Sequence, residues 1–388
     1  MTTENELDVS PMFEPLTIRG MTLRNRFVMP GMQRTWCRDG APVPHLVEYY
    51  RRRAAGGTAL VITETLAVDH PTSTQVPQYG WIREDTKAGW KECVDAVRSE
   101  GGNFFIQLWH EGAIRSEGGD GPLSQHPTLS PSGLASAEKP NGRAMTREEM
   151  EEIKAAFVRG ALMAQEIGTA GVEVHACHGY LLDQFLWKET NRREDGYGGD
   201  DIRDRVRYPA EIVAAIREAV DDDFVVSLRF SQWKEVDYDA KVVETPEELK
   251  IMLDAFREAG ADMIHASTRR FWTPEWPELD PDLGLAGWVK RFTDLPVAAV
   301  GSLGLDVDVM SNLLGEEAHA TGLPSFLELM RRFNRGDFDI MSVGRGQIGD
   351  PQWVSKVRRG AIDEIRSFTK EDVLMDLEIP DLVADAHR

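Results

Sequence analysis

The sequence predicts an α/β protein built around a closed (β/α)8 TIM barrel, with an N-terminal β-hairpin and long loops after the strands. Two observations carry this prediction. Short apolar runs alternate with amphipathic helical segments along most of the chain, a pattern typical of parallel strands joined by helices. The chain has 388 residues, which is enough for a barrel with insertions. A doubly wound open sheet is the alternative that the same pattern allows.

The segment before the barrel predicts the hairpin. Apolar residues alternate on both sides of Arg19-Gly20, and a first buried strand is expected near Phe27. A second strand, Ala59–Thr65, follows a Gly-Gly pair. The remaining strands are expected at Asn103–Trp109, Gly171–His175, Phe224–Phe230, Asp262–Ser267, Pro296–Val300 and Phe338–Val343.

Helices are expected between these strands. The clearest start is Thr146-Arg-Glu-Glu149, a capping box in which both side chains accept backbone N–H groups that the helix leaves free. A Gly-, Pro- and Ser-rich loop at 111–144 and a Trp- and Pro-rich loop at 271–281 interrupt the alternation. The predicted helices span Leu46–Ala55, Thr86–Ser99, Thr146–Ile167, Asp201–Val220, Pro246–Ala259 and Pro351–Arg359.

Composition argues against several classes of function. Asp and Glu outnumber Lys and Arg by 65 to 44, and the net charge of -21 disfavours binding to nucleic acid or to an anionic membrane. No apolar run approaches the ~20 residues of a membrane span. The acidic N-terminus lacks the features of a signal peptide. We therefore expect a cytoplasmic protein that acts on a small molecule, and a homo-oligomer is compatible with the sequence.

The chain is expected to form one barrel domain over residues 1–367, followed by an acidic C-terminal tail at 368–388. No internal repeat or low-complexity linker divides it. The three cysteines, Cys37, Cys93 and Cys177, have no paired spacing. Neither a disulfide framework nor a zinc or iron–sulfur site is therefore indicated.

Polar and glycine residues follow the predicted strands. Because side chains at the carboxyl ends of barrel strands line the active site, we expect these residues to lie together. The glycines at 301–304 and 344–346 are typical of loops that hold phosphate, although they could also serve only in tight turns. Arg345 would add a charged contact. The strand-end residues are Gln107, His175, Arg229, Gly301, Ser302, Gly344 and Arg345.

His175, His178 and Tyr180 lie within six residues of one another. A metal site would need further ligands, and the neighbouring strands offer only Glu64. The histidines could instead be structural. Their position beside a tyrosine favours a third interpretation, in which two ring N–H groups bind a substrate carbonyl oxygen and stabilise the charge that develops on it. Tyr180, with an ordinary pKa of ~10, would then be a general acid.

Arg229 lies inside a predicted strand, where burial is costly without an anion or a hydrogen-bond partner. A salt bridge inside the barrel is one solution. A cofactor with an electron-rich ring edge is another, since a fixed cation stabilises a reduced, anionic ring. Gln107 could then bind the amide-like edge of that ring.

Four motifs make the sequence similar to the Old Yellow Enzyme family of FMN-dependent ene-reductases, from about Phe13 to Arg359. The resemblance implies a (β/α)8 barrel that binds FMN, takes hydride from NADH or NADPH, and reduces the C=C bond of an α,β-unsaturated carbonyl compound by a ping-pong mechanism. The motif that begins at His175 is highly specific. The motifs are Pro15-Leu-Thr-Ile with Leu23-Arg-Asn-Arg-Phe-Val-Met, Gln107-Leu-Trp-His, His175-Ala-Cys-His-Gly-Tyr-Leu-Leu-Asp-Gln-Phe with Thr190-Asn-Arg-Arg-Glu-Asp-Gly-Tyr-Gly-Gly, and Gly344-Arg345 before Asp350-Pro351.

The resemblance also implies roles for individual residues. His175 and His178 look like the family's pair that binds the substrate oxygen, and Tyr180 looks like its proton donor. The residues that look like FMN contacts are Gln107 and Arg229 at the ring, and Gly301, Ser302, Gly344 and Arg345 at the phosphate.

The sequence departs from the family pattern near the expected flavin. The first strand usually leads into Ala-Pro-Met or Ala-Pro-Leu followed by Thr or Cys, whereas this chain has Pro30-Gly31-Met32-Gln33. Thr65 stands where Ala or Gly is common, and Gly112-Ala113-Ile114-Arg115 replaces a Gly-Arg pair. We still expect Pro30, Gly31, Met32, Gln33 and Thr65 to contact FMN.

Some similar enzymes have a longer chain with an iron–sulfur cluster and a second nucleotide-binding domain. The length and the few cysteines of this chain imply a barrel-only enzyme without a metal. Five aromatic residues could form an apolar substrate wall, although at least two of them are expected to serve only in packing. They are Trp36, Trp109, Phe271, Trp272 and Trp276.

Two other functions use the same residues. A flavin-independent lyase or isomerase of a phosphorylated substrate would keep the phosphate loops, with Glu64 as its candidate base. A non-catalytic flavin-binding protein would keep those loops without needing the histidines or Tyr180.

Overall fold

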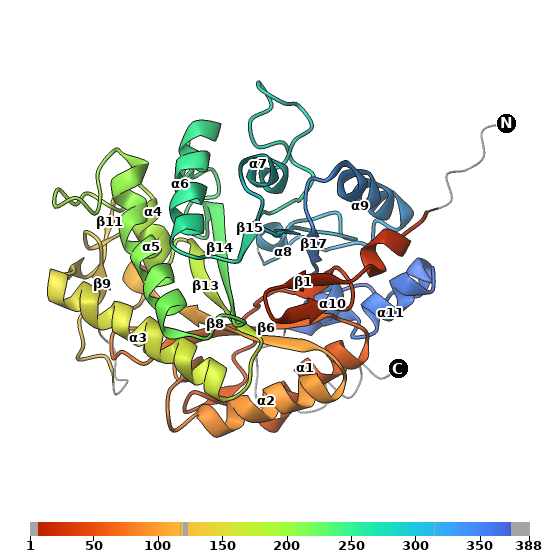
Figure 1. The fold of residues 1–388 in the computed structure, drawn as a ribbon, viewed down its shortest axis with the longest axis horizontal. Coiled ribbons are helices and arrows are strands. Elements are labelled where there is room, and N and C mark those ends of the chain that lie inside the picture. Colours follow the sequence, from red (N-terminus) through yellow and green to blue (C-terminus); the bar gives the residue numbers. More distant parts are fainter. Residues whose placement is uncertain (1–6, 117, 119–122, 314, 374–388) are drawn as a thin grey trace.

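The computed structural model describes residues 7–116, 118, 123–313 and 315–373 (Figure 1). Eight parallel strands form a barrel, which closes because β3 pairs with β17 on one side and with β6 on the other. The predicted barrel is confirmed, and the open sheet is wrong. The barrel strands are β3 (Phe27–Met29), β6 (Leu60–Val68), β8 (Asn103–Trp109), β13 (Gly171–His178), β14 (Val225–Lys234), β15 (Met263–Ser267), β16 (Val297–Val300) and β17 (Ile340–Ser342).

The predicted hairpin is confirmed and covers the amino-terminal end of the barrel. β1 (Leu16–Ile18) and β2 (Met21–Leu23) pair in the antiparallel direction. Their buried side chains pack against inward-facing residues at the starts of the barrel strands, such as Leu60, Phe105 and Val225. Because this apolar cluster fills the amino-terminal end, a polar site is left to the carboxyl-terminal end.

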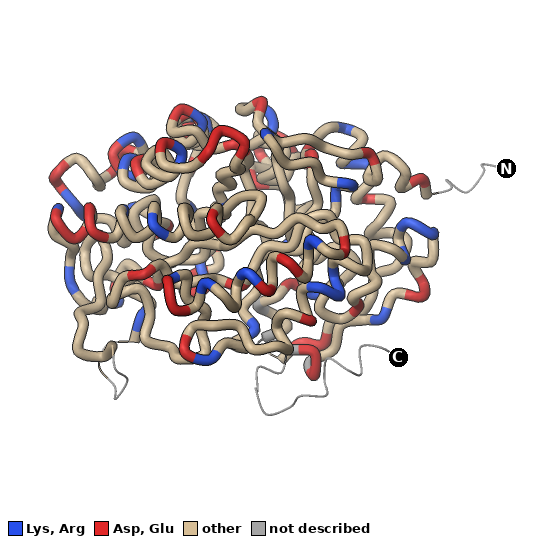
Figure 2. The backbone as a smooth tube through the Cα atoms, turned by 60° about the horizontal axis from the view of Figure 1, so that its bottom comes forward, with Lys and Arg blue, Asp and Glu red and all other residues tan. Residues whose placement is uncertain are grey.

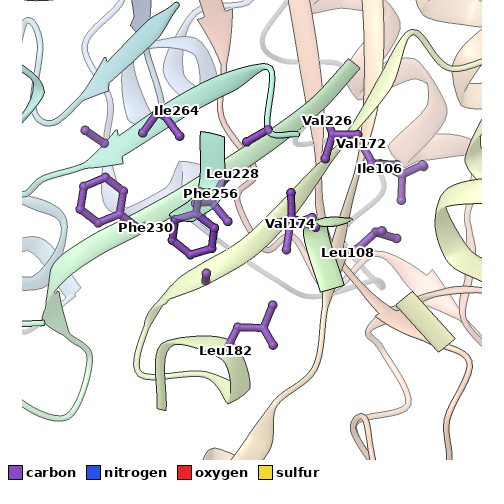
Figure 3. Close-up of a cluster of buried hydrophobic side chains, with 14 of the residues drawn as sticks. Ile106, Leu108, Val172, Val174, Leu182, Val226, Leu228, Phe230, Phe256 and Ile264 are labelled. Atoms are coloured by element: carbon purple, nitrogen blue, oxygen red, sulfur yellow. The ribbon is translucent and has the colours of Figure 1, made fainter. Parts of the chain in front are cut away.

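A second core lies between the barrel and the surrounding helices (Figure 3). Val172 and Val174 of β13 and Leu228 of β14 pack there, together with Phe256 from the helix α6 (Pro246–Glu258). Side chains alternate between the two faces of a strand. Glu173 and His175 therefore face the barrel interior.

The six predicted helices are present, and their first residues lie within two positions of the predicted starts. At α3, the N–H of Glu149 donates to Thr146 Oγ1 at 3.2 Å and the N–H of Thr146 donates to Glu149 Oε2 at 2.9 Å, so the capping box is confirmed. The other helices are α1 (Pro44–Ala55), α2 (Lys87–Ser99), α3 (Arg147–Glu166), α4 (Leu181–Leu186), α5 (Ile202–Ala219), α7 (Leu285–Phe292), α8 (Val309–Leu313), α9 (Leu323–Arg335), α10 (Arg345–Gly349) and α11 (Trp353–Arg358), with 3-10 helices at Ser10–Phe13, Gly112–Ile114, Ile362–Glu364 and Lys370–Val373.

Three strands, β6, β13 and β14, continue past their predicted ends, and β13 ends at His178 instead of His175. β6 extends to Val68 because Leu66–Val68 pair with β7 (Gly80–Ile82), a strand that the sequence did not predict. β14 extends to Lys234, where a register shift pairs that residue with His178. The extension of β14 places the segment after this strand beside the loop that carries Tyr180.

The long loop predicted at 111–144 contains short strands. These are β9 (Leu129–Ser130), β10 (Leu134–Ser136), β11 (Lys139–Pro140) and β12 (Arg143–Ala144), and a further pair, β4 (Cys37–Arg38) and β5 (Ala41–Pro42), follows β3. Residues 117 and 119–122 of the loop and residues 374–388 of the predicted acidic tail lie outside the described residues.

Acidic and basic residues are interspersed over the outer helices and loops (Figure 2). Within the described part of the chain, the search for a helix that is both long and apolar enough to cross a membrane finds none.

Candidate active site

A cavity of about 290 Å³ lies at the carboxyl-terminal end of the barrel strands. The loops after β3, β14, β15, β16 and β17 bound it, so residues far apart in the sequence meet there. Several predicted site residues line it, namely Pro30, Gly31, Met32, Gln33, His178, Arg229, Gly301, Ser302, Gly344 and Arg345. Phe368, the first residue of the predicted tail, is buried at its wall.

One side of the cavity carries a buried cation. Arg345 Nη2 donates to Ser302 Oγ at 3.0 Å, and burial lowers the pKa of Arg345 to about 10, which leaves it charged at neutral pH. Gly301 has a φ of 148°, and a Cβ atom there would lie 2.7 Å from Thr268 Oγ1. Only glycine fits this position. The hydrogen bond to Ser302 holds the loop after β16 beside the guanidinium group of Arg345. A guanidinium group in such a position can bind an anion.

Arg229 lines a second side of the cavity, and the buried side chain of Gln107 lies against Gly31 of the same wall. Gln107 Oε1 and Arg229 Nε have no hydrogen-bond partner among the described residues. A Cβ atom on Gly31 would lie 2.7 Å from Gln107 Nε2, so glycine is needed for the loop after β3 to approach this side chain. Unpaired buried polar atoms are costly. A ring with hydrogen-bond donors and acceptors along one edge would satisfy them.

Below these residues lies a polar network that the sequence analysis missed. Glu173 accepts hydrogen bonds from Gln107 Nε2 at 2.7 Å and from His265 Nδ1 at 2.8 Å, and all three side chains are fully buried. Burial alone would raise the pKa of Glu173, but His265, Arg229 and Gln107 hold that pKa at about 2. Since an ionised carboxylate only accepts, it orients the Gln107 amide with Oε1 available. A Glu within a strand of apolar residues was the available signal.

Ser267 connects Arg229 to His178. Arg229 Nη2 donates to Ser267 Oγ at 3.2 Å, and His178 Nε2 lies 2.9 Å from the same oxygen. Burial and nearby Arg229 keep the pKa of His178 well below its usual value, so the ring is neutral. If Ser267 donates to Nε2, the proton of His178 resides on Nδ1. That N–H is then available to a substrate oxygen.

The three predicted catalytic side chains lie together. The ring centroid of His175 is 5.4 Å from that of His178 and 5.3 Å from that of Tyr180. Burial, with Arg229, lowers the pKa of His175 to about 3. Burial also raises the pKa of Tyr180 well above its usual value. At neutral pH the site therefore offers two neutral imidazoles and a protonated phenol.

A buried ion pair fixes the loop that carries Tyr180. Lys234 Nζ lies 2.9 Å from Asp183 Oδ1, and neither side chain is exposed. Asp183 Oδ2 also accepts the N–H of Gly179 at 2.6 Å. The end of β14 is thereby tied to the loop between β13 and α4. Sequence reasoning missed this pair, because each partner looks like an ordinary surface charge.

Two of the departures from the family pattern, Gln33 and Thr65, contact each other. Thr65 Oγ1 donates to Gln33 Oε1 at 2.6 Å, which orients the Gln33 amide. Gln33 Nε2 is buried and has no hydrogen-bond partner among the described residues. Gln33 therefore offers a donor at the cavity wall.

The structure does not bring the five predicted aromatic residues together. Trp109 packs on Tyr180, with ring centroids 5.1 Å apart, and is the member of the set beside the catalytic side chains. Trp36 packs instead on Tyr49. Phe271 packs on Trp272, and Trp276 packs on Trp288, and none of these three predicted residues lines the cavity.

Trp233 is an aromatic residue of the site that the sequence analysis missed. It lines the cavity, and its ring centroid lies 4.5 Å from that of His178. Its position just after the predicted fifth strand was the available signal.

Glu64 does not provide the further ligand that a metal site at His175 and His178 would need. Its carboxylate accepts the N–H groups of Arg34 and Thr35 at 2.6 and 3.1 Å and lies 3.1 Å from Cys37 Sγ, so it organises the loop after β3. The possible ligand atoms of His175, Cys177 and His178 do lie within 4.8 Å of one another. Burial, however, raises the pKa of the Cys177 thiol well above its usual value, which opposes the thiolate that binds metals.

The fold and these contacts define a (β/α)8-barrel protein with a cavity at the carboxyl ends of its strands. The chain belongs to the NADH:flavin oxidoreductase / NADH oxidase family, whose model matches residues 11–319. The resemblance stated from the sequence motifs is thereby confirmed. The buried, unpaired atoms of Gln33, Gln107 and Arg229 fit the flavin ring that the family implies.

The chain is similar to curated relatives and solved structures. It is 34% identical over 368 residues to an NADH oxidase of Thermoanaerobacter brockii, covering 92% of this chain but 52% of the relative. It is 30% identical over 332 residues to an NADPH dehydrogenase of Geobacillus sp., covering 84% of this chain and 92% of the relative. Morphinone reductase in complex with tetrahydroNAD matches with a TM-score of 0.77 and 24% identity over 95% of both chains, which shows the shared fold. The chain spans about half the length of the first curated relatives that it matches.

Proposed function

We propose that this chain is an FMN-dependent oxidoreductase that takes hydride from NADH or NADPH and reduces the C=C bond of an electron-poor alkene, such as an α,β-unsaturated carbonyl compound. The observation that carries the proposal is the grouping of neutral His175 and His178 with protonated Tyr180 beside a cavity that also holds Arg345. FMN, when bound, would supply hydride transfer. Gln33, Gln107 and Arg229 would hold its ring, and Ser302 and Arg345 its phosphate.

The chain's own residues would polarise the substrate and protonate it. A carbonyl oxygen would accept N–H groups from His175 and His178, which stabilise the negative charge that builds up as the β-carbon receives hydride. Both rings stay neutral, because their pKa values lie far below 7. The Oη–H bond of Tyr180 then breaks, and its proton forms the new C–H bond at the α-carbon.

The alternative functions have less support. A lyase or isomerase loses its candidate base, because the Glu64 carboxylate is committed to the loop after β3. A non-catalytic flavin-binding protein would not need Tyr180 beside two neutral imidazoles. The cytoplasmic location and the homo-oligomer stay predictions from the sequence.

The spectrum of the purified protein tests this proposal. We expect an oxidised-flavin absorption band that NADH or NADPH bleaches without oxygen, and that 2-cyclohexen-1-one restores. A colourless protein that binds no added FMN would favour the lyase or isomerase. A band that nicotinamide does not bleach would favour a non-catalytic flavin-binding protein.

His175→Ala with His178→Ala should weaken the binding of a phenol such as 4-hydroxybenzaldehyde by roughly tenfold to a hundredfold, because two hydrogen bonds to its oxygen are lost. Titration of the flavin spectrum with the phenol measures this. Affinity for FMN should change little, since neither ring is expected at the phosphate or the ring edge. Unchanged phenol affinity would contradict the oxygen-binding role.

Arg345→Met should weaken FMN binding by about tenfold to a hundredfold, the effect of losing a hydrogen bond to a charged group. Riboflavin provides the matched control, because it has the same ring and no phosphate. Fluorescence titration of the flavin-free protein with both ligands measures the difference. Equal losses for FMN and riboflavin would contradict a phosphate contact.

A further inference from the structure

Glu235 is a carboxyl group that the proposed reaction leaves unused. It follows β14, lines the cavity and is exposed at its mouth. Tyr180 Oη donates to Glu235 Oε2 at 3.1 Å. A solvent-accessible carboxyl group therefore contacts the hydroxyl that is expected to give up a proton.

The contact is built into the fold. The N–H of Glu235 donates to the carbonyl of His178 at 3.1 Å, and the preceding residue forms the buried ion pair with Asp183. His178 has a φ of 63°, a left-handed conformation that is uncommon for a residue with a side chain. The loop that carries Tyr180 is thus held against Glu235 by backbone and side-chain contacts.

The surroundings of Tyr180 make a free phenolate unfavourable. Its ring packs between Trp109 and His175. The ionisable groups that face it are Tyr79, Glu111, Glu235 and the neutral His175, and both carboxylates raise the pKa of the phenol. If Tyr180 lost its proton without compensation, the phenolate would add a further negative charge beside Glu111 and Glu235.

We propose that Glu235 is a proton-relay residue that reloads Tyr180 during alkene reduction. As the Tyr180 Oη–H bond breaks and the α-carbon gains that proton, the O–H bond of the Glu235 carboxyl group breaks and its proton forms a new bond to Oη. The carboxylate then recovers a proton from water, so the net proton comes from solvent. The relay rests on the function proposed above.

Two further observations support the relay. A protonated Glu235 would donate to Oη, which leaves the phenolic O–H free to point at the substrate. Although one edge of Glu235 is exposed, partial desolvation by the cavity wall raises its pKa above the usual value, and the hydrogen bond from Tyr180 opposes the shift. Glu111 is the other carboxyl group near Tyr180, but none of the described hydrogen bonds joins it to the phenol.

The test measures single-turnover alkene reduction. The FMN-loaded protein is reduced with one equivalent of NADH or NADPH without oxygen, mixed with 2-cyclohexen-1-one, and followed by flavin absorbance. Glu235→Gln should slow reoxidation by about a hundredfold, the lower end of the effect of positioned proton transfer. Glu235→Asp should retain more activity, and acetate should partly restore Glu235→Ala in proportion to its concentration.

Matched measurements separate the relay from a structural role. Reduction by nicotinamide and phenol affinity should be unchanged in Glu235→Gln. Glu211→Gln removes a carboxylate that accepts the phenol of Tyr197 at 2.7 Å outside the cavity, and it should leave reoxidation unchanged. The relay would be overturned if Glu235→Gln were reoxidised as fast as the wild type, or if Glu235→Ala were slow and acetate did not restore it. It would also be overturned if Glu111→Gln slowed reoxidation and Glu235→Gln did not. Failure of the wild type to reduce the enone would instead overturn the proposed function.

Discussion

Tyr180→Phe is expected to slow alkene reduction by about 10²–10⁴-fold, the range that a positioned general acid contributes. The change removes only the hydroxyl, so the ring can keep its packing against Trp109 and His175. Reduction by nicotinamide transfers hydride and needs no proton from this residue. Rapid-mixing measurements of the two half-reactions should therefore show one slow and one nearly normal step.

A matched variant serves as the control for this result. Tyr197→Phe removes another phenol that is hydrogen-bonded to a glutamate, at 2.7 Å from Glu211, and this phenol does not line the cavity. Both half-reactions should stay close to wild type in this control. Equal slowing of both half-reactions in Tyr180→Phe would contradict the proton-donor role.

Asp183→Ala is expected to lower the free energy of unfolding by about 3–5 kcal/mol, because the change leaves the fully buried Lys234 as an uncompensated charge. The N–H of Gly179 also loses its acceptor. Urea unfolding of the variant and the wild type measures the difference. Alkene reduction should weaken as well, since the loop that carries Tyr180 is no longer tied to β14.

Two controls show whether burial causes this effect. Asp95→Ala breaks an exposed ion pair with Lys91 and should change stability little. Asp183→Asn combined with Lys234→Met removes both charges and should cost less than Asp183→Ala alone. A loss for Asp183→Ala no larger than that for Asp95→Ala would contradict the account.

Much of the barrel could be predicted because local signals and tertiary packing agree. Asn103–Trp109 was predicted with its observed bounds, since a Gly-Gly pair precedes an apolar run there. The helix after Thr146 was predicted from its cap. The ends of β6 and β14 were not, because their last residues are extended only through pairing with β7 and β13. The local sequence does not indicate which distant strand will pair with these residues.

The grouping of the candidate catalytic residues could be predicted because they belong to one sequence motif. His175, His178 and Tyr180 lie close in sequence and lie together in the structure. Partners from different strands were missed, because His265 and Glu173 are 92 positions apart and meet only when the barrel closes. We expected aromatic residues of the loop at 271–281 to form part of a substrate wall. Trp276 of this loop packs on Trp288 of the neighbouring helix, and aromatic content alone does not tell packing from binding.

Isotope labelling identifies the source of each of the two hydrogen atoms that the proposed reaction adds to the alkene. The protein would reduce 2-methyl-2-cyclohexen-1-one with nicotinamide deuterated at C4 in ordinary water, and with ordinary nicotinamide in deuterated water. Unlabelled product incubated in deuterated buffer controls for exchange. We expect deuterium from nicotinamide at the β-carbon and deuterium from solvent at the α-carbon. No saturated ketone, or solvent deuterium at the β-carbon, would contradict the proposed reaction.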